Sequence, residues 1–231
     1  MNKKGFTLAE VLITLGIIGV VAALTLPPVI SHHNKKVVET RLAKFYSVMN
    51  QAIQRSIADN GDMEYWITDP DVLEEGRYIN DTKLFDKYII PYLDAETYYN
   101  YEVGGYANNR KVYVLKDGSA FNSEITHMTF SFTPDILVDS LSNGDVELKY
   151  MGKKLFHFVI PKCSNNTAYH NSAKDMIGIV PTSNIYELKK QNREDEADTW
   201  DCNEDRKGKV NCAAVIMRNG WKIPDDYPIK F

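Results

Sequence analysis

The sequence predicts an α+β fold, in which a long N-terminal helix packs on an antiparallel β-sheet head. Three observations support this prediction. Residues 6–26 form an apolar run, residues 38–57 repeat apolar side chains at helical spacing, and residues 111–160 contain short apolar segments separated by turns. The first half of the helix is predicted to span a membrane, and the second half to be amphipathic.

The apolar run follows a short basic N-terminus. Lys3 and Lys4 precede it, and Glu10 is the only ionisable side chain among the 21 residues from Phe6 to Leu26. A helix of that length is about 30 Å long, enough to cross the hydrocarbon core of a bilayer. A carboxylate near the start of such a span is disfavoured by up to ~3 kcal/mol, so Glu10 is expected to have a partner. The N-terminal lysines predict that this end is cytoplasmic, although residues 35–36, both lysine, compete with that orientation.

The hexapeptide from Gly5 to Glu10 followed by an apolar helix resembles the prepilin N-terminus of type IV pilins and type II secretion pseudopilins. The resemblance implies cleavage by a prepilin peptidase after Gly5, N-methylation of Phe6, and guidance of subunit addition by Glu10. It implies a pilin-like fold with a leader (1–5), a transmembrane and assembly helix (6–30), and an amphipathic helix with a periplasmic or extracellular head (31–231). Helices of this family often kink near the position of Pro27.

Two other interpretations of the N-terminus were weighed. A secretory signal peptide cleaved after Ala23 has the required basic and apolar regions, and an uncleaved signal anchor would make Glu10 incidental. The apolar core is long for a signal peptide and contains a carboxylate, so the prepilin interpretation is preferred.

Composition limits the function of the rest of the chain. The chain has 231 residues and a formal net charge of −4, which becomes −6 when residues 1–5 with their two lysines are removed. About 200 residues remain beyond the span, enough for one domain with its own core. An acidic body disfavours nonspecific binding of nucleic acid over the whole surface.

The helix is predicted to continue from about residue 30 to residue 59. Its apolar positions recur at spacings of three and four, and Asn60-Gly61 is a stop signal. This stripe consists of Val38, Leu42, Phe45, Met49, Ile53 and Ile57. Adjacent histidines at 32 and 33 point in different directions on a helix, so no metal site is expected there.

Residues 62–109 are predicted to be irregular with short helices. One helix is expected to start at Asp69-Pro70, and another is expected to be capped by Asp81 and ended by Pro91. A tyrosine cluster at positions 98, 99, 101 and 106 has two interpretations. A loop that covers the edge of the sheet is favoured over a contact surface for carbohydrate or protein.

Four or five antiparallel strands are predicted from residue 111 onward. Alternating or β-branched segments indicate strands at 111–115, 120–121, 128–132, 146–150 and 155–160, and residues 136–138 are a further candidate. Asp117-Gly118 and Asn143-Gly144 are predicted turns.

The chain contains three cysteines, at positions 163, 202 and 212. In an oxidising compartment one bridge is expected, with Cys202–Cys212 preferred because the two are close in sequence. Pairing of Cys163 with either of them remains the alternative.

An acidic run near the C-terminus is the one candidate cation site. Its carboxylates are Glu194, Asp195, Glu196, Asp198, Asp201, Glu204 and Asp205. Calcium is considered because it takes several carboxylate oxygens, but the spacing of a calcium loop is missing and a solvated loop is preferred. No metal ligand and no other cofactor is therefore predicted, and the absence of catalytic motifs predicts that the chain is not an enzyme.

The predicted function is a structural subunit of a type IV pilus or type II secretion pseudopilus. The alternatives are a pilus-tip adhesin, a substrate-binding minor pilin, or a secreted soluble domain released by signal peptidase. Expected partners are other pilin or pseudopilin subunits, the prepilin peptidase, the inner-membrane assembly machinery and membrane lipid, with no specific nucleic acid. The expected location is the inner membrane, as a single-pass protein with a periplasmic head, or an extracellular filament.

Overall fold

The computed structural model describes residue 5 and residues 7–74, 78–103, 108–125, 128–142, 144–163, 176–182, 202 and 211–231. The chain divides into two compact units, Met1–Val38 with Phe231, and Glu39–Lys230. We call the second the head unit.

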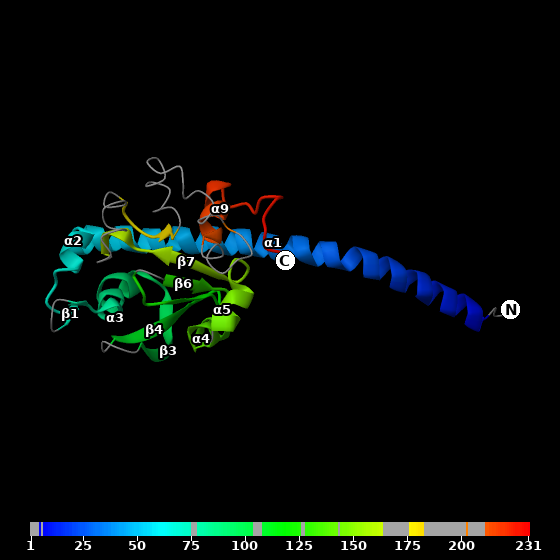
Figure 1. Cartoon of the computed structure of the whole chain (residues 1–231), viewed down its shortest axis with the longest axis horizontal. Helices are drawn as coiled ribbons and strands as arrows, with labels where there is room; N and C mark the ends of the chain where they lie inside the picture. Colours follow the sequence, from blue (N-terminus) through cyan, green and yellow to red (C-terminus); the bar gives the residue numbers. More distant parts are fainter. Residues whose placement is uncertain are drawn as a thin grey trace. The chain divides into compact units, whose positions relative to one another are not determined.

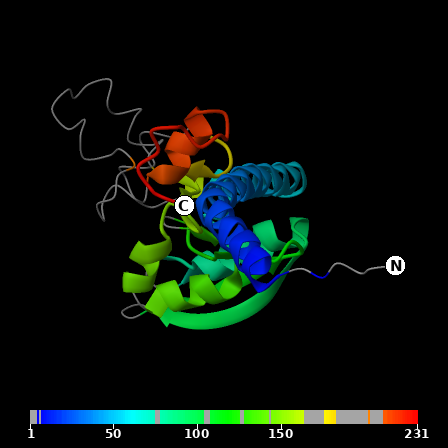
Figure 2. The same cartoon turned by 90° about the vertical axis from the view of Figure 1, so that its right-hand side faces the viewer.

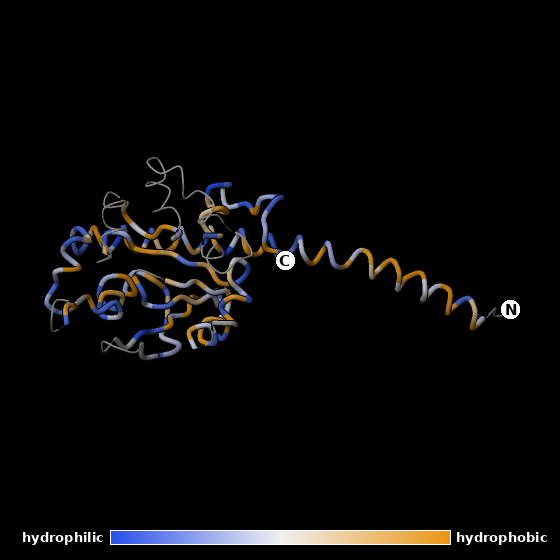
Figure 3. The backbone as a smooth tube through the Cα atoms, viewed as in Figure 1, coloured by the Kyte–Doolittle hydropathy of each residue, from blue (hydrophilic) through white to orange (hydrophobic). Residues whose placement is uncertain are grey.

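A single helix, α1 (Leu8–Asn60), contains both the apolar run and the amphipathic stripe. It has 53 residues and continues through Pro27 and Pro28, so no break separates its two parts. The segment from Leu8 to Ile30 is predominantly hydrophobic (Figure 3), and its large apolar side chains are exposed. Among the described residues, α1 is the one helix long and apolar enough to cross a membrane.

The head unit contains a six-stranded antiparallel sheet in the order β3-β4-β5-β6-β7-β8 (Figure 1). Its strands are β3 (Ala95–Val103), β4 (Asn108–Leu115), β5 (Ala120–Asn122), β6 (Met128–Ser131), β7 (Leu155–Val159) and β8 (Val180–Pro181). Successive strands pair with one another, so β3 is one edge and β8 is the other. The predicted α+β class with a long helix on an antiparallel sheet is confirmed.

Helices cover both faces of the sheet (Figure 2). On one face, the Phe45 ring of α1 lies 4.2 Å from that of Phe130 and 5.3 Å from that of Phe158, measured between centroids. On the other face, α4 (Pro134–Ser142) buries Leu137 against Val112 and its neighbours. Strand β6 is therefore buried on both faces. Its alternating sequence had predicted burial on one face only.

Two predicted strands are helices. Residues 136–138 lie in α4, and residues 146–150 lie in α5 (Gly144–Tyr150). Pro134 stands at the first helical position of α4, where proline favours a helix start. Strand β6 already pairs with β5 on one side and β7 on the other, so these segments have no sheet edge to join there.

The region between α1 and the sheet also differs from its prediction. It contains α2 (Met63–Trp66), the hairpin β1 (Leu73–Glu74) and β2 (Tyr78–Ile79), α3 (Asp81–Leu84), η1 (Phe85–Ile89) and η2 (Ile90–Tyr92). The helix start predicted at residues 69–70 is wrong, because α2 starts earlier, where the Asp62 side chain accepts a hydrogen bond from the Glu64 N–H. Asn80, not Asp81, caps α3.

The tyrosines at 98, 99 and 101 lie in strand β3, so the predicted loop is wrong for them. Tyr106 and Asn143 lie outside the described residues. The short elements η3 (Pro161–Cys163), β8 and α9 (Cys212–Arg218) had not been predicted.

Candidate functional site

A capping box closes the N-terminus of α1. The Thr7 N–H and the Thr7 hydroxyl both donate to Glu10 Oε2 at 2.8 Å, and the Glu10 N–H donates to Thr7 Oγ1 at 3.3 Å. This reciprocal pair satisfies backbone donors that a helix start leaves unpaired. Thr7 was not among the predicted site residues, although the Thr-x-x-Glu spacing is the sequence signature of this motif.

One carboxylate oxygen of Glu10 accepts no hydrogen bond from the described residues. Both of its hydrogen bonds from the described residues go to Oε2, and its side chain is exposed. The hydroxyls of Thr14 and Thr25 instead donate to carbonyls of their own helix at 2.9 Å. Polar groups in lipid need such internal partners. Among the described side chains from Leu8 to Ile30, Glu10 is thus the one that combines a charge with an oxygen that accepts no hydrogen bond.

The predicted cleavage junction lies ahead of α1. Gly5 is exposed and precedes the first helical residue, Leu8, by three positions. Phe6, the predicted methylation site, lies outside the described residues.

The C-terminal segment, residues 211–230, is attached to α1 within the head unit. Glu39 of α1 accepts hydrogen bonds from the Ile223 N–H at 3.0 Å and from Lys222 Nζ at 3.1 Å. Two turns further along α1, the Tyr46 ring lies 5.0 Å from that of Trp221. These contacts fix one flank of the amphipathic half of α1.

A second attachment lies further along the same flank. Asn50 Oδ1 accepts a hydrogen bond from the Ile179 N–H at 2.9 Å. Gly178 has φ 105°, and a Cβ there would stand 1.8 Å from Asn50 Oδ1. The backbone before β8 approaches α1 this closely because residue 178 has no side chain.

The cysteines divide into one bridge and one buried thiol. Cys202 is bonded to Cys212, the pairing preferred from the sequence, and Cys163 is free and buried. Burial raises the pKa of the Cys163 thiol well above its usual value. Cys212 begins α9 and lies against the turn at Gly152, whose carbonyl accepts the Tyr227 hydroxyl at 2.7 Å.

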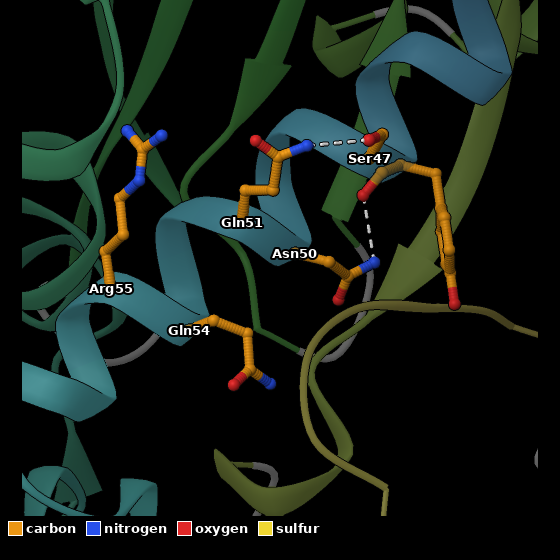
Figure 4. A pocket seen from close by; sticks show the side chains of 6 residues that line it. Ser47, Asn50, Gln51, Gln54 and Arg55 are labelled. Carbon is orange, nitrogen blue, oxygen red and sulfur yellow. Dashed lines mark hydrogen bonds between the residues drawn. The ribbon is translucent and has the colours of Figure 1, made fainter.

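A shallow depression of about 490 Å³ lies on the outer face of α1 (Figure 4). Two of its amides are occupied locally, since Asn50 Nδ2 donates to the Tyr46 carbonyl and Gln51 Nε2 donates to Ser47 Oγ, both at 2.9 Å. The described lining consists of Tyr46, Ser47, Asn50, Gln51, Gln54 and Arg55. These side chains do not pair a nucleophile with a base, so they provide no catalytic arrangement.

No group of three or more potential metal ligands lies together among the described residues. The acidic run at 194–205, considered for calcium, lies outside the described residues apart from Cys202. His32 and His33 lie in α1 and are exposed.

Comparison with known families gave two matches. Residues 1–26 match the prokaryotic N-terminal methylation motif, the prepilin cleavage motif of type IV pilins and pseudopilins. Residues 28–231 match a family described as a family of unknown function (DUF6613). Searches of curated proteins and of solved structures gave no match. Because the second match covers most of the chain, the protein belongs to the DUF6613 family, and it carries the prepilin-type methylation motif at its N-terminus.

Proposed function

We propose that the chain is a structural subunit of a type IV pilus or a type II secretion pseudopilus. In this proposal a prepilin peptidase cuts the precursor after Gly5, Phe6 is N-methylated, and residues 6–30 anchor the subunit before assembly. The observation that supports it best is Glu10. Its carboxylate is the one charged side chain in the exposed stretch from Leu8 to Ile30, it lies within the residues that match the methylation motif, and it has an oxygen without a partner among the described residues.

The proposed assembly contact joins two subunits. Cleavage creates a cationic amine on Phe6, and the Glu10 carboxylate of an incoming subunit pairs with the amine of a subunit already in the filament. The Thr7 bonds hold Oε2 and leave Oε1 for that amine. A buried ion pair often contributes little net stability but fixes register, which suits a filament whose apolar helices otherwise slide past one another.

The proposed location is the inner membrane, with the head unit in the periplasm. The basic residues at positions 3–4 favour a cytoplasmic N-terminus. The Cys202–Cys212 bridge supports an oxidising compartment for the head unit.

Processing gives the first test. We expect mass spectrometry of protein purified from the native membrane to show a chain that begins at Phe6 and carries one added methyl group. A Gly5→Leu variant should keep residues 1–5, because the peptidase motif is lost. A native chain that begins at Leu24, or one that retains Met1, would contradict the proposal.

The second test concerns Glu10. Glu10→Gln keeps the shape of the side chain and its capping geometry but removes the charge, so membrane insertion and cleavage should continue. We expect the ratio of filament-associated to membrane-associated protein to fall about tenfold or more, corresponding to about 1.4 kcal/mol or more per subunit.

Thr25→Val is the matched control for Glu10→Gln. It removes a polar group from the same helix whose hydroxyl is already bound to the Val21 carbonyl. It should leave the ratio unchanged. A normal ratio for processed Glu10→Gln would show that the carboxylate is only tolerated and that the assembly contact is wrong.

A further inference from the structure

A group of basic side chains follows the exposed apolar stretch of α1. It consists of His32, His33, Lys35 and Lys36, and no charged residue separates it from Glu10. His32, His33 and Lys36 are exposed, and Lys35 is half-buried. We call the four residues the basic collar. The collar lies entirely in the first compact unit of the chain, on the same unbroken helix as the apolar stretch.

The length of the apolar stretch places the collar at a membrane surface. From Leu8 to Ile30 the helix is about 34 Å long, whereas the hydrocarbon core of a bilayer is about 30 Å thick. Positions 31–36 add about 9 Å, which matches the headgroup layer outside the core. Lysine side chains at this depth keep their stems on apolar surface and their ammonium groups among the headgroups.

The collar carries positive charge on the side of the span where it opposes the proposed orientation. Cleavage after Gly5 removes Lys3 and Lys4, so the lysines nearest to the span in the mature chain are those of the collar. These lysines oppose insertion and are retained after the leader is lost. Their charge therefore suits a contact at the far surface of the membrane, where the phosphates of lipid headgroups are the most abundant anions.

The carboxylates near the collar do not cancel its charge. Glu10 is about 33 Å away along α1, and Glu39 already accepts hydrogen bonds from Lys222 Nζ and the Ile223 N–H. Phe231 belongs to the same unit as the collar and adds at most one carboxylate against two lysines. Residues 222–230 carry charges that balance, namely Lys222, Asp225, Asp226 and Lys230. The collar therefore keeps a net positive charge and two imidazole donors.

The next cations of α1 are held by the head unit, so the collar ends at Lys36. Arg41 donates to the Phe132 carbonyl at 3.0 Å, and Lys44 pairs with Asp117 at 2.7 Å. Lys36 itself already has an interaction within the protein. Its ammonium group carries three N–H donors, however, so it can donate to a phosphate oxygen as well.

One face of α1 joins the collar to an apolar path. Val29, His33 and Lys36 follow one another at spacings of four and three, so they lie on one face of the helix. Leu26 precedes Val29 by three positions, and the two side chains are 55% and 63% exposed. A phospholipid has the same order of parts, with acyl chains that fit against Leu26 and Val29 and a phosphate that reaches the collar. A free phosphate ion or a nucleic acid lacks the apolar part.

We infer that the basic collar binds the phosphate of an anionic phospholipid in the leaflet opposite the N-terminus. Lysine near an anionic membrane surface adds to binding, so a headgroup with net negative charge, as in phosphatidylglycerol, is preferred to a zwitterionic one. This inference rests on the proposed membrane anchoring by residues 6–30 and names the lipid partner of that anchor. The bound headgroup fixes the depth of the span, and with it the depth of Glu10, before assembly.

Lipid selection by the full mature chain tests the inference. The chain in detergent micelles is offered equal amounts of phosphatidylglycerol and phosphatidylcholine with the same acyl chains, and native mass spectrometry counts the lipid retained. We expect bound phosphatidylglycerol to exceed phosphatidylcholine about fivefold or more. Lys35→Gln with Lys36→Gln keeps the helix propensity and removes both charges, so it should bring the two lipids within about twofold of each other.

Lys149→Gln with Lys154→Gln is the matched control. Both lysines are exposed in the head unit, so the loss of charge is the same and the lipid preference should remain. Equal retention of the two lipids by the unchanged chain would overturn the inference. So would a preference that survives in the collar variant or that is lost in the control.

Two further measurements identify the source of the phosphate. Excess inorganic phosphate should displace no more phosphatidylglycerol than chloride does at the same ionic strength, and stronger displacement would show a site for the free ion instead. In the native membrane, p-benzoylphenylalanine in place of His33 should crosslink to phospholipid. The same probe in place of Gln51, which is exposed on α1 within the head unit, should not. A His33 adduct with protein in place of lipid, or equal lipid adducts at the two positions, would contradict the lipid contact.

The N-terminal mass and the filament fraction of the same cells separate this inference from the proposed function. Filaments of chains that are processed at Gly5 but show no preference for phosphatidylglycerol would leave the proposed function standing and overturn the lipid contact. A collar-dependent preference in chains that stay unprocessed or form no filaments would support the lipid contact and contradict the filament function. Absence of both would overturn both.

Discussion

Replacement of Asp81 by alanine is expected to lower the free energy of unfolding of the head unit by about 3–5 kcal/mol, because it leaves a buried charge without its partner. Asp81 and Arg110 form an ion pair in which each side chain is 12% exposed. The same carboxylate oxygen accepts the Ile125 N–H at 3.2 Å, and Arg110 also donates to the Ser123 carbonyl at 2.9 Å. Burial lowers the pKa of Arg110, a sign of how poorly this site tolerates an unpaired cation.

Denaturant unfolding of the full chain in detergent, followed by tryptophan fluorescence, measures this effect. Asp94→Ala is the matched control, since Asp94 pairs with Lys116 on the surface, where the two side chains are 66% and 78% exposed. It should change the free energy by less than about 1 kcal/mol. The double variant Asp81→Leu with Arg110→Met should recover much of the loss, because it removes both charges. Equal losses for Asp81→Ala and Asp94→Ala would contradict this account of the pair.

Replacement of Gly152 by alanine is expected to destabilise the head unit by about 2–5 kcal/mol. Gly152 has φ 78°, a left-handed conformation that costs other residues about 1–2 kcal/mol. A Cβ there would also stand 3.1 Å from both Cys212 Sγ and Ile229 Cγ1, and overpacking of this kind costs about 1–3 kcal/mol. Thermal unfolding under non-reducing conditions, with labelling of free thiols, measures both the stability and the state of the bridge.

Gly118→Ala separates the two contributions. Gly118 also has φ 78°, in the turn between β4 and β5, but a Cβ there would meet no atom within 4 Å. It should therefore show the conformational cost alone, about 1–2 kcal/mol. Equal losses of stability in Gly152→Ala and Gly118→Ala would contradict this account. They would show that crowding of the new Cβ against Cys212 and Ile229 adds nothing to the cost of Gly152→Ala.

The elements predicted correctly are those whose apolar pattern reflects packing against a single neighbouring element. Leu42, Phe45, Met49 and Ile53 are all buried, because a helix on a sheet needs one continuous apolar stripe. Strand β7 was predicted from an apolar run that ends at a proline. Residues 136–138 were assigned wrongly because three successive apolar residues suit either a strand or a buried helix turn, and the occupied edges of β6 decide between them.

The candidate sites show the same division. Gly5, Phe6 and Glu10 were predicted from a contiguous motif, and Thr7 belongs to a signature of four residues that was present in the sequence. The basic collar was present in the sequence as a short basic group after the apolar stretch, but the exposure of its side chains is known only from the structure. The contact of Glu39 with Ile223 joins residues 184 positions apart, and no local pattern encodes such a separation.

The burial of Cys163 has a consequence for the oxidative maturation of this protein. Three thiols allow three different single bridges, and two of these use Cys163. Once β7 and η3 have folded, Cys163 is 1% exposed and its protonated thiol is a poor nucleophile. An oxidant that reaches the folded head unit then meets a single reactive pair. Oxidation that follows folding is therefore expected to give the Cys202–Cys212 bridge without mispaired products that involve Cys163.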